Sequence, residues 1–191
     1  MRDEIVAAAE QLLTERGSMA AVTVADIVGR VGVTAPVLYQ HFADKEGLFV
    51  EVHARRVTDF RDCLRRSARR GDPPLTALEK RGRAYIRYAT SRRDAYVALF
   101  MTPNSLGMDV FRDPRTESDT AFDDLVANVQ ACVNAGEIPP CDVQLAARIV
   151  WAQVHGLASL LIAMPEITDG VGQSAMVDRM IASITASLVA G

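Results

Sequence analysis

Apolar side chains recur at every third or fourth position along most of the chain, the spacing that places them on one face of a helix. Residues 2–16 show this pattern clearly, with Ile5 and Leu12 on one face and Gly17 directly after the stretch. The same spacing predicts further helices over residues 24–31, 35–42, 45–70, 74–92, 94–101, 118–134, 141–164 and 171–189. We therefore expect an all-α protein.

Residues 23–46 contain the signals for two short helices joined by a tight turn. Thr23 and Thr34 are residues that commonly cap helix N-termini, and Pro36 falls in the first turn of the second helix, where a missing backbone N–H is tolerated. Gly32 ends the first helix at the position where a left-handed residue is usual. Two short helices around such a turn form a helix-turn-helix, which lays its second helix in the major groove of DNA.

This stretch resembles the DNA-binding domain of TetR-type repressors, and the resemblance covers roughly the first quarter of the chain. The matching residues are Thr23, Ile27, Val28, Gly32, Val33, Thr34, Leu38, Tyr39, His41, Phe42, Asp44, Lys45, Glu46 and Leu48. Gly29 departs from a good helix sequence, because alanine would be about 1 kcal/mol more favourable there. The resemblance implies a three-helix domain over residues 1–47 that binds double-stranded operator DNA.

The resemblance also implies two kinds of contact with DNA. The residues expected to hold the phosphate backbone are Thr23, Thr34, Tyr39 and Lys45. By their position on the second helix, Ala35, Val37, Gln40 and His41 are expected to face the groove. Pro36 lies among them and should stiffen the turn that presents this surface. Gln40 is the best hydrogen-bonding group of this set, since glutamine pairs with the N6 and N7 atoms of adenine. Pro36 and Val37 replace polar residues that some family members carry, so fewer hydrogen bonds to base edges are expected.

The predicted helix over residues 45–70 joins this domain to the rest of the chain. Residues 55–93 hold thirteen basic and four acidic side chains, whereas the segments on either side are acidic and the whole chain has a net charge of −3. A solvent-exposed basic face is one interpretation, and attraction to DNA or to an anionic ligand are the others. Because the DNA-binding segment is itself not basic, its specific contacts must come from a few placed groups.

Residues 48–191 are expected to bind an effector and to form a dimer. The stretch 94–101 is almost wholly apolar and must be buried or line a pocket, and residues 102–117 are predicted to form a functional or mobile loop. We expect an apolar cavity between the helices predicted over residues 48–134. Its candidate lining and contact residues are Phe60, Arg61, Arg65, Arg81, Tyr85, Tyr88, Leu99, Phe122, Trp151 and His155.

The last two predicted helices, residues 141–164 and 171–189, are apolar on two sides and so need partners on both sides. One side fits the core of this chain, and the other fits a second copy in an intermolecular four-helix bundle. The residues expected at this homodimer interface are Val150, Val154, Leu157, Leu161, Val177, Ile181, Ile184 and Leu188.

Trp151, His155 and Gly156 resemble the Trp-x-x-x-His-Gly signature of one C-terminal domain found in TetR-like regulators, here called WHG-type. Trp151 and His155 are four residues apart and so lie on one helix face. His155 is either a satisfied core histidine or a ligand contact. Gly156 in the middle of a helix suggests that another helix approaches closely. The resemblance implies a helical domain that binds a ligand and dimerises.

Several functional classes are disfavoured by the sequence. His41, His53 and His155 show no metal-ligand spacing, and no phosphate loop, nucleophile elbow or dinucleotide motif is present, so we expect no enzyme, metal or cofactor. Three cysteines without a CxxC pair argue against a disulfide framework, and Cys132 with Cys141 is the nearest pair for redox sensing. No apolar run reaches the roughly 18–20 residues of a membrane span. We expect a cytoplasmic protein without membrane association.

We interpret the chain as an all-α, dimeric, ligand-responsive transcriptional repressor in which residues 1–47 bind DNA. Two alternatives stay open at this stage. The first is a DNA-binding protein that acts constitutively without a ligand. The second is a helical adaptor whose helix-turn-helix packs only against protein.

Overall fold

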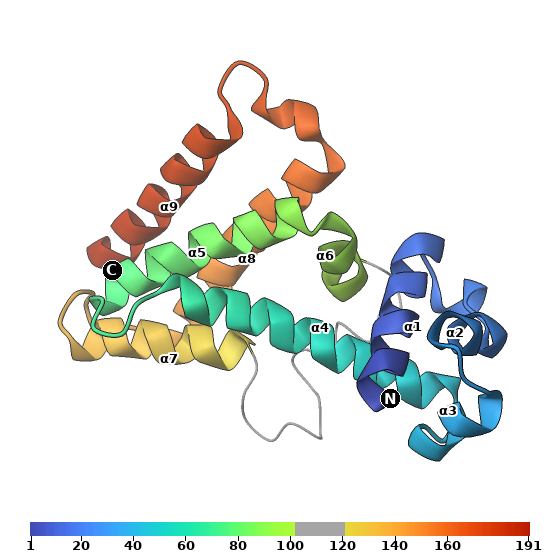
Figure 1. The fold of residues 1–191 in the computed structure, drawn as a ribbon. Helices are drawn as coiled ribbons and strands as arrows, with labels where there is room; N and C mark the ends of the chain where they lie inside the picture. The colour runs from blue at the N-terminus through green and yellow to red at the C-terminus, as the bar shows by residue number, and fades with distance from the viewer. Residues whose placement is uncertain (102–120) are drawn as a thin grey trace. The chain divides into compact units, whose positions relative to one another are not determined.

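The computed structural model describes residues 1–101 and 121–191, and these residues form helices and turns without any β-strand (Figure 1). The all-α prediction is confirmed. The chain divides into two compact units, Met1–Thr58 and Asp59–Gly191. The division falls within one helix, α4 (Lys45–Ser67), and further along the chain than the domain boundary expected at residue 47, which stays a prediction.

The first unit contains three short helices, the start of α4 and a 3₁₀ turn. The elements are α1 (Arg2–Arg16), η1 (Met19–Ala21), α2 (Val24–Val31) and α3 (Ala35–His41). Each helix predicted for this unit is present, because their apolar faces meet in one core. The most buried members of that core are Ile5, Val6, Ala9, Leu12, Val22, Ile27, Leu38, Leu48, Phe49 and Val52.

Local capping signals shape the turn between α2 and α3. The Thr23 hydroxyl oxygen accepts from the backbone N–H of Asp26, and the Asp26 carboxylate accepts from the backbone N–H of Thr23, which closes a capping box. Gly32 follows α2 with φ 78°, in the left-handed region, and donates its N–H to the Val28 carbonyl. Thr34 precedes α3, but its side chain makes no capping hydrogen bond.

Arg56 lies on α4 but is buried in the first unit, with only 4% of its surface exposed. Its Nε donates to Glu10 Oε1 at 3.0 Å, and its Nη2 donates to Thr14 Oγ1 at 3.0 Å. Because a buried charge is tolerated only when it is paired and hydrogen-bonded, these two acceptors on α1 explain its position. The interpretation of the α4 arginines as one solvent-exposed face is therefore wrong for Arg56.

The second unit contains the rest of α4 and a bundle arranged around α5. Its helices are α5 (Pro74–Ser91), α6 (Arg93–Phe100), α7 (Ala121–Asn134), α8 (Val143–Ala163) and α9 (Gln173–Ala190). α5 packs against each of the other four (Figure 1). α4 ends at Ser67 rather than at residue 70, and the other helix ends lie close to those predicted. The loop predicted over residues 102–117 and the start of the helix predicted from residue 118 lie outside the described residues.

α5 lies close to side chains of α8 and α9 at Gly82. A Cβ atom at this position would lie 2.6 Å from Cδ1 of Ile181 and 3.7 Å from Cγ1 of Val154, so the end of the Ile181 side chain would have to move to admit a larger residue. Gly156 differs, because nothing lies within 4 Å of the position of its Cβ. The close approach expected at Gly156 is therefore not made by any described part of this chain.

Among the described helices, α8 alone is long and apolar enough to cross a membrane, judged by length and composition. This differs from the expectation that no apolar run suffices. The inward side chains of α8, such as Val154 and Ala158, are buried in the second unit. Packing within the folded unit therefore accounts for the apolar character of this inward stripe.

Candidate DNA-binding helix and ligand pocket

The outward side chains of α3 are those that the sequence assigned to DNA. The exposed members of this set are Thr34, Pro36, Tyr39, Gln40 and His41. Ala35 and Val37 are half-buried, since they lie next to the face on which Leu38 enters the core. Half of the surface of Tyr39 is exposed, which is a large exposure for an aromatic residue. The helix thus presents a polar surface without an acidic group.

Thr23 and Lys45 were also expected to contact phosphates, but both make hydrogen bonds inside the first unit. The Thr23 hydroxyl donates to the Asp26 carboxylate. The Lys45 ammonium donates to the carbonyls of Met19 at 3.1 Å and Val22 at 3.0 Å. Lys45 therefore ties the start of α4 to the turn after α1, and only one of its three N–H groups remains for a phosphate.

The arginines near the helix-turn-helix are neutralised within the unit. Arg16 pairs with Asp26 through two hydrogen bonds of 2.6 and 2.8 Å, and Arg30 pairs in the same bidentate way with Glu15. Hydrogen bonds from Arg16 and Thr23 lower the pKa of Asp26 well below its usual value. Little unpaired positive charge is left on this surface. The structure therefore agrees with the sequence in showing a weak electrostatic footprint for DNA.

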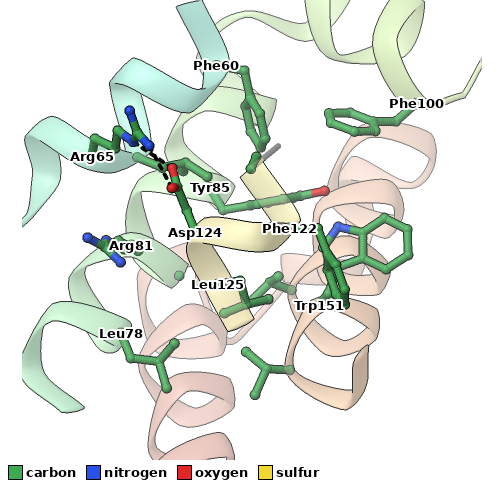
Figure 2. A pocket seen from close by; sticks show the side chains of 15 residues that line it. Phe60, Arg65, Leu78, Arg81, Tyr85, Phe100, Phe122, Asp124, Leu125 and Trp151 are labelled. Atoms are coloured by element: carbon green, nitrogen blue, oxygen red, sulfur yellow. Dashed lines mark hydrogen bonds and ion pairs between the residues drawn. The ribbon is translucent and has the colours of Figure 1, made fainter. Parts of the chain in front are cut away.

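The second unit contains an apolar cavity to which five helices contribute (Figure 2). Its lining residues are Phe60, Leu64 and Arg65 of α4; Leu78, Arg81, Gly82 and Tyr85 of α5; Phe100 of α6; Ala121, Phe122, Asp124 and Leu125 of α7; and Val150, Trp151 and Val154 of α8. Six of these were candidates from the sequence, namely Phe60, Arg65, Arg81, Tyr85, Phe122 and Trp151. The structure thus brings together residues far apart in the chain.

Four other candidates do not line the cavity. Tyr88 is buried against Phe60, with ring centroids 5.1 Å apart, and the guanidinium of Arg92 lies over the Tyr88 ring. Leu99 is fully buried in the core. Arg61 donates to Asp124, and His155 lies beyond Tyr85 rather than on the wall. These four residues are neighbours of the wall, so their assignment as ligand contacts is not supported by the geometry.

Sequence reasoning missed nine residues of the lining. Several of them lie three or four positions from a residue that was named: Leu64 follows Phe60, Leu125 follows Phe122, and Val154 follows Trp151. Residues at this spacing share a helix face, so helical periodicity could have found them. Asp124 had no such signal, because its role depends on arginines from another helix.

Aromatic rings form one side of the cavity. Phe60 meets the rings of Tyr85 and Phe100 edge-on, with centroids 5.2 Å away in both cases. Figure 2 shows Phe100, Phe122 and Trp151 gathered on the side opposite to Arg65 and Arg81. The cavity therefore has an aromatic side and a side that carries charged groups.

Two tyrosines and a histidine meet behind the aromatic wall. The Tyr96 hydroxyl lies 2.7 Å from Nδ1 of His155, and the Tyr85 hydroxyl lies 3.0 Å from the same atom. The two hydroxyl oxygens are 3.1 Å apart. Trp151 stacks on the His155 ring, with centroids 5.1 Å apart. The network joins α5, α6 and α8 through side chains that also form or support the cavity wall.

All three groups of this network are uncharged at neutral pH. Burial raises the pKa of the Tyr96 hydroxyl to about 12 and raises that of Tyr85 well above its usual value. Burial lowers the pKa of His155, because desolvation penalises the imidazolium. Nδ1 of a neutral His155 can therefore accept a hydrogen bond from a tyrosine, with the ring proton on Nε2. The arrangement favours the interpretation of His155 as a satisfied core histidine.

The charged side of the cavity contains one complete ion pair. Arg65 donates from Nε and Nη2 to the two carboxylate oxygens of Asp124 at 2.6 and 2.7 Å, and Arg61 donates to the same carboxylate at 3.3 Å (Figure 2). Desolvation acts to raise the pKa of Asp124, but the two guanidinium groups lower it overall. Asp124 is therefore an ionised partner that holds α4 to α7.

Arg81 is held differently, by an amide. Its Nη1 donates to Oδ1 of Asn128 at 2.8 Å, and Asn128 in turn donates from Nδ2 to the carbonyl of Pro74 at 2.8 Å. The Nε of Arg81 is buried without a hydrogen-bond acceptor in the described structure. Arg81 thus brings a positive charge to the cavity wall with only a neutral partner.

Comparison with known proteins identifies the family. Residues 5–52 match the family described as bacterial regulatory proteins, tetR family, and residues 78–184 match the family described as Tetracyclin repressor-like, C-terminal domain. The chain belongs to the TetR family of bacterial regulators. No curated protein sequence is significantly similar to the chain. TetR regulators bind operator DNA and act as dimers, which agrees with the helix-turn-helix of the first unit.

Solved structures share the fold of this TetR-family chain. A protein of unknown function from Rhodococcus sp. RHA1 is 20% identical with a TM-score of 0.78, over 98% of this chain and 95% of that chain. The regulator FadR from Bacillus subtilis, in complex with stearoyl-CoA, is 15% identical with a TM-score of 0.72, over 100% of this chain and 99% of its own. The fatty acid degradation regulator FadR from Bacillus halodurans is 16% identical with a TM-score of 0.74, over 98% and 100%.

The side chains that the sequence assigned to a dimer interface are buried within the second unit of this TetR-family chain. Those with less than a tenth of their surface exposed are Val150, Val154, Leu157, Leu161, Val177, Ile181 and Ile184, and Leu188 is half-buried. Side chains already buried in one chain have little surface to offer a second. The prediction therefore selected the inward stripe of α8 and α9. The outward side is carried by other residues, including Leu145, Ile149, Leu160 and Val189.

The cysteines show little sign of redox chemistry. Cys132 is buried, and burial raises the pKa of its thiol to about 11, whereas Cys141 is exposed. A reactive cysteine needs thiolate character, which Cys132 lacks at neutral pH. The structure therefore gives no support to Cys132 as a redox sensor.

Proposed function

We propose that this chain is a ligand-responsive transcriptional regulator, a repressor that a small-molecule effector releases from an inverted-repeat operator. The observation that carries the proposal is the apolar cavity of the second unit, which Phe60, Leu64 and Arg65 of α4 help to line. α4 is one continuous helix whose first turns belong to the helix-turn-helix unit. A ligand in the cavity therefore contacts an element that is shared with the DNA-binding unit.

The fold relatives support a small-molecule effector. FadR from Bacillus subtilis, which shares the fold over nearly the whole chain, holds stearoyl-CoA. A helical bundle of this fold can therefore accommodate an organic ligand. The cavity of this chain, with its rings from α4 to α8, offers such a ligand an apolar site.

The second unit is a WHG-type domain in this proposal. The support is the stacking of Trp151 on His155, which places the first residue of the signature on the cavity wall and the second behind it. Trp151 is then the ligand-facing member and His155 orients it through the tyrosine network. We place the protein in the cytoplasm, where operator DNA is found.

The proposed regulator is a homodimer that forms through the outer face of α8 and α9. Leu145, Ile149 and Leu160 lie on one face of α8 and are 42–52% exposed, and Val189 of α9 is 51% exposed. Several large apolar side chains on adjacent helices mark an interaction surface, whereas a single one would not. The open space beside Gly156 permits a helix of the second copy to come close. A stable pair should bury more than about 1,000 Å².

The proposed mechanism is a shift between two dimer conformations. In one conformation the two α3 helices match successive major grooves, and in the other their spacing is wrong for DNA. The effector binds the second conformation more tightly and so lowers the affinity for the operator. Changing the population from 1:99 to 99:1 requires a differential affinity of about 10⁴-fold.

Binding to the gene region directly upstream of this protein's own coding sequence tests the proposal. Fluorescence anisotropy with that DNA and with a scrambled duplex should show tighter binding to the former. Thermal-shift screening of a metabolite panel should then find compounds that stabilise the protein, and these should release the specific DNA. Specific binding that no stabilising compound reverses would favour a constitutive DNA-binding protein. The absence of any specific binding would favour a helical adaptor and contradict the proposal.

A further inference from the structure

We infer that the cavity of the second unit takes a compact apolar anion, and that the anionic group pairs with Arg81. The inference rests on the proposed function, because it takes this cavity as the effector site. It adds the chemical class of the ligand and the residue that recognises it. Four observations carry it: the unmatched charge of Arg81, the fixed position of Asn128, the saturation of Asp124, and the size and aromatic character of the cavity.

Arg81 is a cation on an apolar wall without an anionic partner in the described structure. Of its five N–H groups, one at Nη1 donates to Asn128 at 2.8 Å, and no carboxylate of the described residues lies within ion-pair distance. Its Nε–H is buried and has no acceptor. Buried polar groups in native proteins are nearly always satisfied, so an exception calls for an explanation. A ligand anion that binds at the Nη hydrogens not used by Asn128 supplies the missing negative charge.

Asn128 keeps Arg81 in place without neutralising it. The Asn128 side chain is 5% exposed, and its Nδ2 donates to the Pro74 carbonyl at 2.8 Å. That bond orients the amide so that Oδ1 faces Arg81 and accepts from it. The guanidinium is therefore held in advance of ligand binding, which reduces the entropy lost when a carboxylate binds to its planar fork.

Asp124, the one acidic residue among the described residues of the cavity lining, already pairs with arginines of α4. It accepts two hydrogen bonds from Arg65 and a third from Arg61. The pair of Arg65 and Asp124 is neutral as a unit, so Arg81 is left as the charged group that the lining does not balance. A ligand with one negative group completes the set, whereas a cationic ligand would add to the unbalanced charge.

The remaining lining selects an apolar body of limited size. Phe60, Tyr85, Phe100, Phe122 and Trp151 supply ring faces and edges, which suit an aromatic ring. The space open to the centres of water molecules is about 60 Å³. One water needs roughly 10–15 Å³ on this measure, so the cavity has room for only a few waters. A single ring with a short acidic side chain fits this space better than a long acyl chain.

A matched pair of ligands tests the inference. 3-Phenylpropanoate and 3-phenylpropanamide share their ring and chain and differ in charge at one end. Trp151 is the only tryptophan of the chain and lines the cavity, so its fluorescence reports binding directly. At neutral pH the acid should bind the wild-type protein about tenfold more tightly than the amide, as expected for a charge-assisted bidentate pair. Decanoate should bind less tightly than 3-phenylpropanoate.

Variants of two arginines on α5 provide the control. Arg81→Met keeps an apolar stem but removes the charge, and it should bind the acid and the amide equally. Arg87 is exposed on the same helix, and Arg87→Met should keep the full preference for the acid. Arg81→Lys should keep a reduced preference, because it retains the charge but loses the planar fork. If Arg81→Met fails to fold, the relative affinities of the wild-type protein and of Arg81→Lys for the acid and the amide test the inference.

The outcomes separate this inference from the proposed function. Equal binding of acid and amide to the wild-type protein overturns the anionic ligand but leaves the cavity as a site for a neutral effector. Binding of neither compound overturns the inference, while operator binding is judged separately by anisotropy. A preference for the acid that depends on Arg81, without release of operator DNA, supports the inference and counts against effector release by this class of ligand.

Discussion

The hydroxyls of Tyr85 and Tyr96 share one acceptor, because they lie 3.0 and 2.7 Å from the same Nδ1 atom of His155. Only one of them donates to that nitrogen at a time. The other can donate to the neighbouring tyrosine hydroxyl, since the two hydroxyl oxygens are 3.1 Å apart. Tyr85 belongs to the cavity wall and Tyr96 to α6, so the shared acceptor couples the wall to a helix behind it.

This sharing predicts that the two tyrosines are not independent in stability. Tyr85→Phe leaves Tyr96 to donate to His155, and Tyr96→Phe leaves Tyr85 to do the same. Each single substitution should cost about 1 kcal/mol. The double variant leaves Nδ1 without a tyrosine donor and should cost at least roughly 0.5 kcal/mol more than the sum. Urea unfolding of the four proteins measures this, and additive costs would show that the nitrogen is not shared.

The buried state of His155 predicts a dependence of stability on pH. Its pKa is lowered in the folded protein, so the unfolded chain binds a proton more readily. The contribution to stability is complete above the unfolded value of about 6.5 and falls as the pH decreases toward the lower folded value. The melting temperature of the wild-type protein should therefore decrease on acidification through this range. His155→Gln removes the titrating imidazole and should therefore make this decrease smaller.

The dimer face can be distinguished from the core by two isoleucines. Ile149 of α8 is 48% exposed, whereas Ile184 of α9 is 5% exposed. Ile149→Asp should give a folded monomer, because it puts a charge in the proposed interface. Ile184→Asp should instead destabilise the subunit itself by several kcal/mol, because it buries an unpaired charge. Light scattering after size-exclusion chromatography, together with circular dichroism, separates the two effects. A wild-type protein that is monomeric at micromolar concentration would rule out the proposed interface.

Two glycines of the helix-turn-helix should respond to alanine in opposite directions. Gly29 lies within α2 with no atom within 4 Å of a new Cβ, so Gly29→Ala should stabilise the protein by about 0.5–1 kcal/mol through helix propensity. Gly32 has φ 78°, which alanine adopts only with strain. Gly32→Ala should therefore destabilise the protein by about 1 kcal/mol or more. Thermal and urea unfolding give both values, and a loss of stability in Gly29→Ala would contradict the first.

Substitutions of two neighbouring residues of α3, Tyr39 and Gln40, should distinguish contacts with the DNA bases from contacts with the phosphate backbone. Gln40→Ala should cost roughly 1–3 kcal/mol on the operator and little on scrambled DNA. Tyr39→Phe removes a hydroxyl expected at a phosphate and should weaken binding to both duplexes alike. Anisotropy on an operator selected from random DNA measures both. Equal losses for Gln40→Ala on the two duplexes would remove Gln40 from base reading.

Lys45 has two expected effects because its ammonium bonds to two backbone carbonyls in the first unit. Lys45→Ala should lower the stability of the protein as well as its affinity for DNA of any sequence. The salt dependence of binding should fall by roughly one unit only if the third N–H contacts a phosphate. A melt performed beside the binding titration separates the two contributions.

The sequence by itself determined the helices, the helix-turn-helix and the family. These features depend on local signals, namely the helix caps at Thr23 and Gly32 and the spacing of apolar residues. Such signals act between residues a few positions apart, whose relative positions are set by helix geometry. Some aromatic residues of the cavity were also predictable. Phe60, Tyr85 and Trp151 each lie on an apolar face of a predicted helix, and such a face must be buried.

Tertiary structure alone decided which side of each helix faces inward and which charges are paired. α8 and α9 are apolar on two sides, so periodicity could not tell the core stripe with Ile184 from the outward stripe with Ile149. The three arginines differ in their partners: Arg56 pairs with Glu10, Arg65 with Asp124, and Arg81 with Asn128. These partners are 46, 59 and 47 residues away in the chain. Local patterns carry no information about such distant partners, because only the packing of helices brings them together.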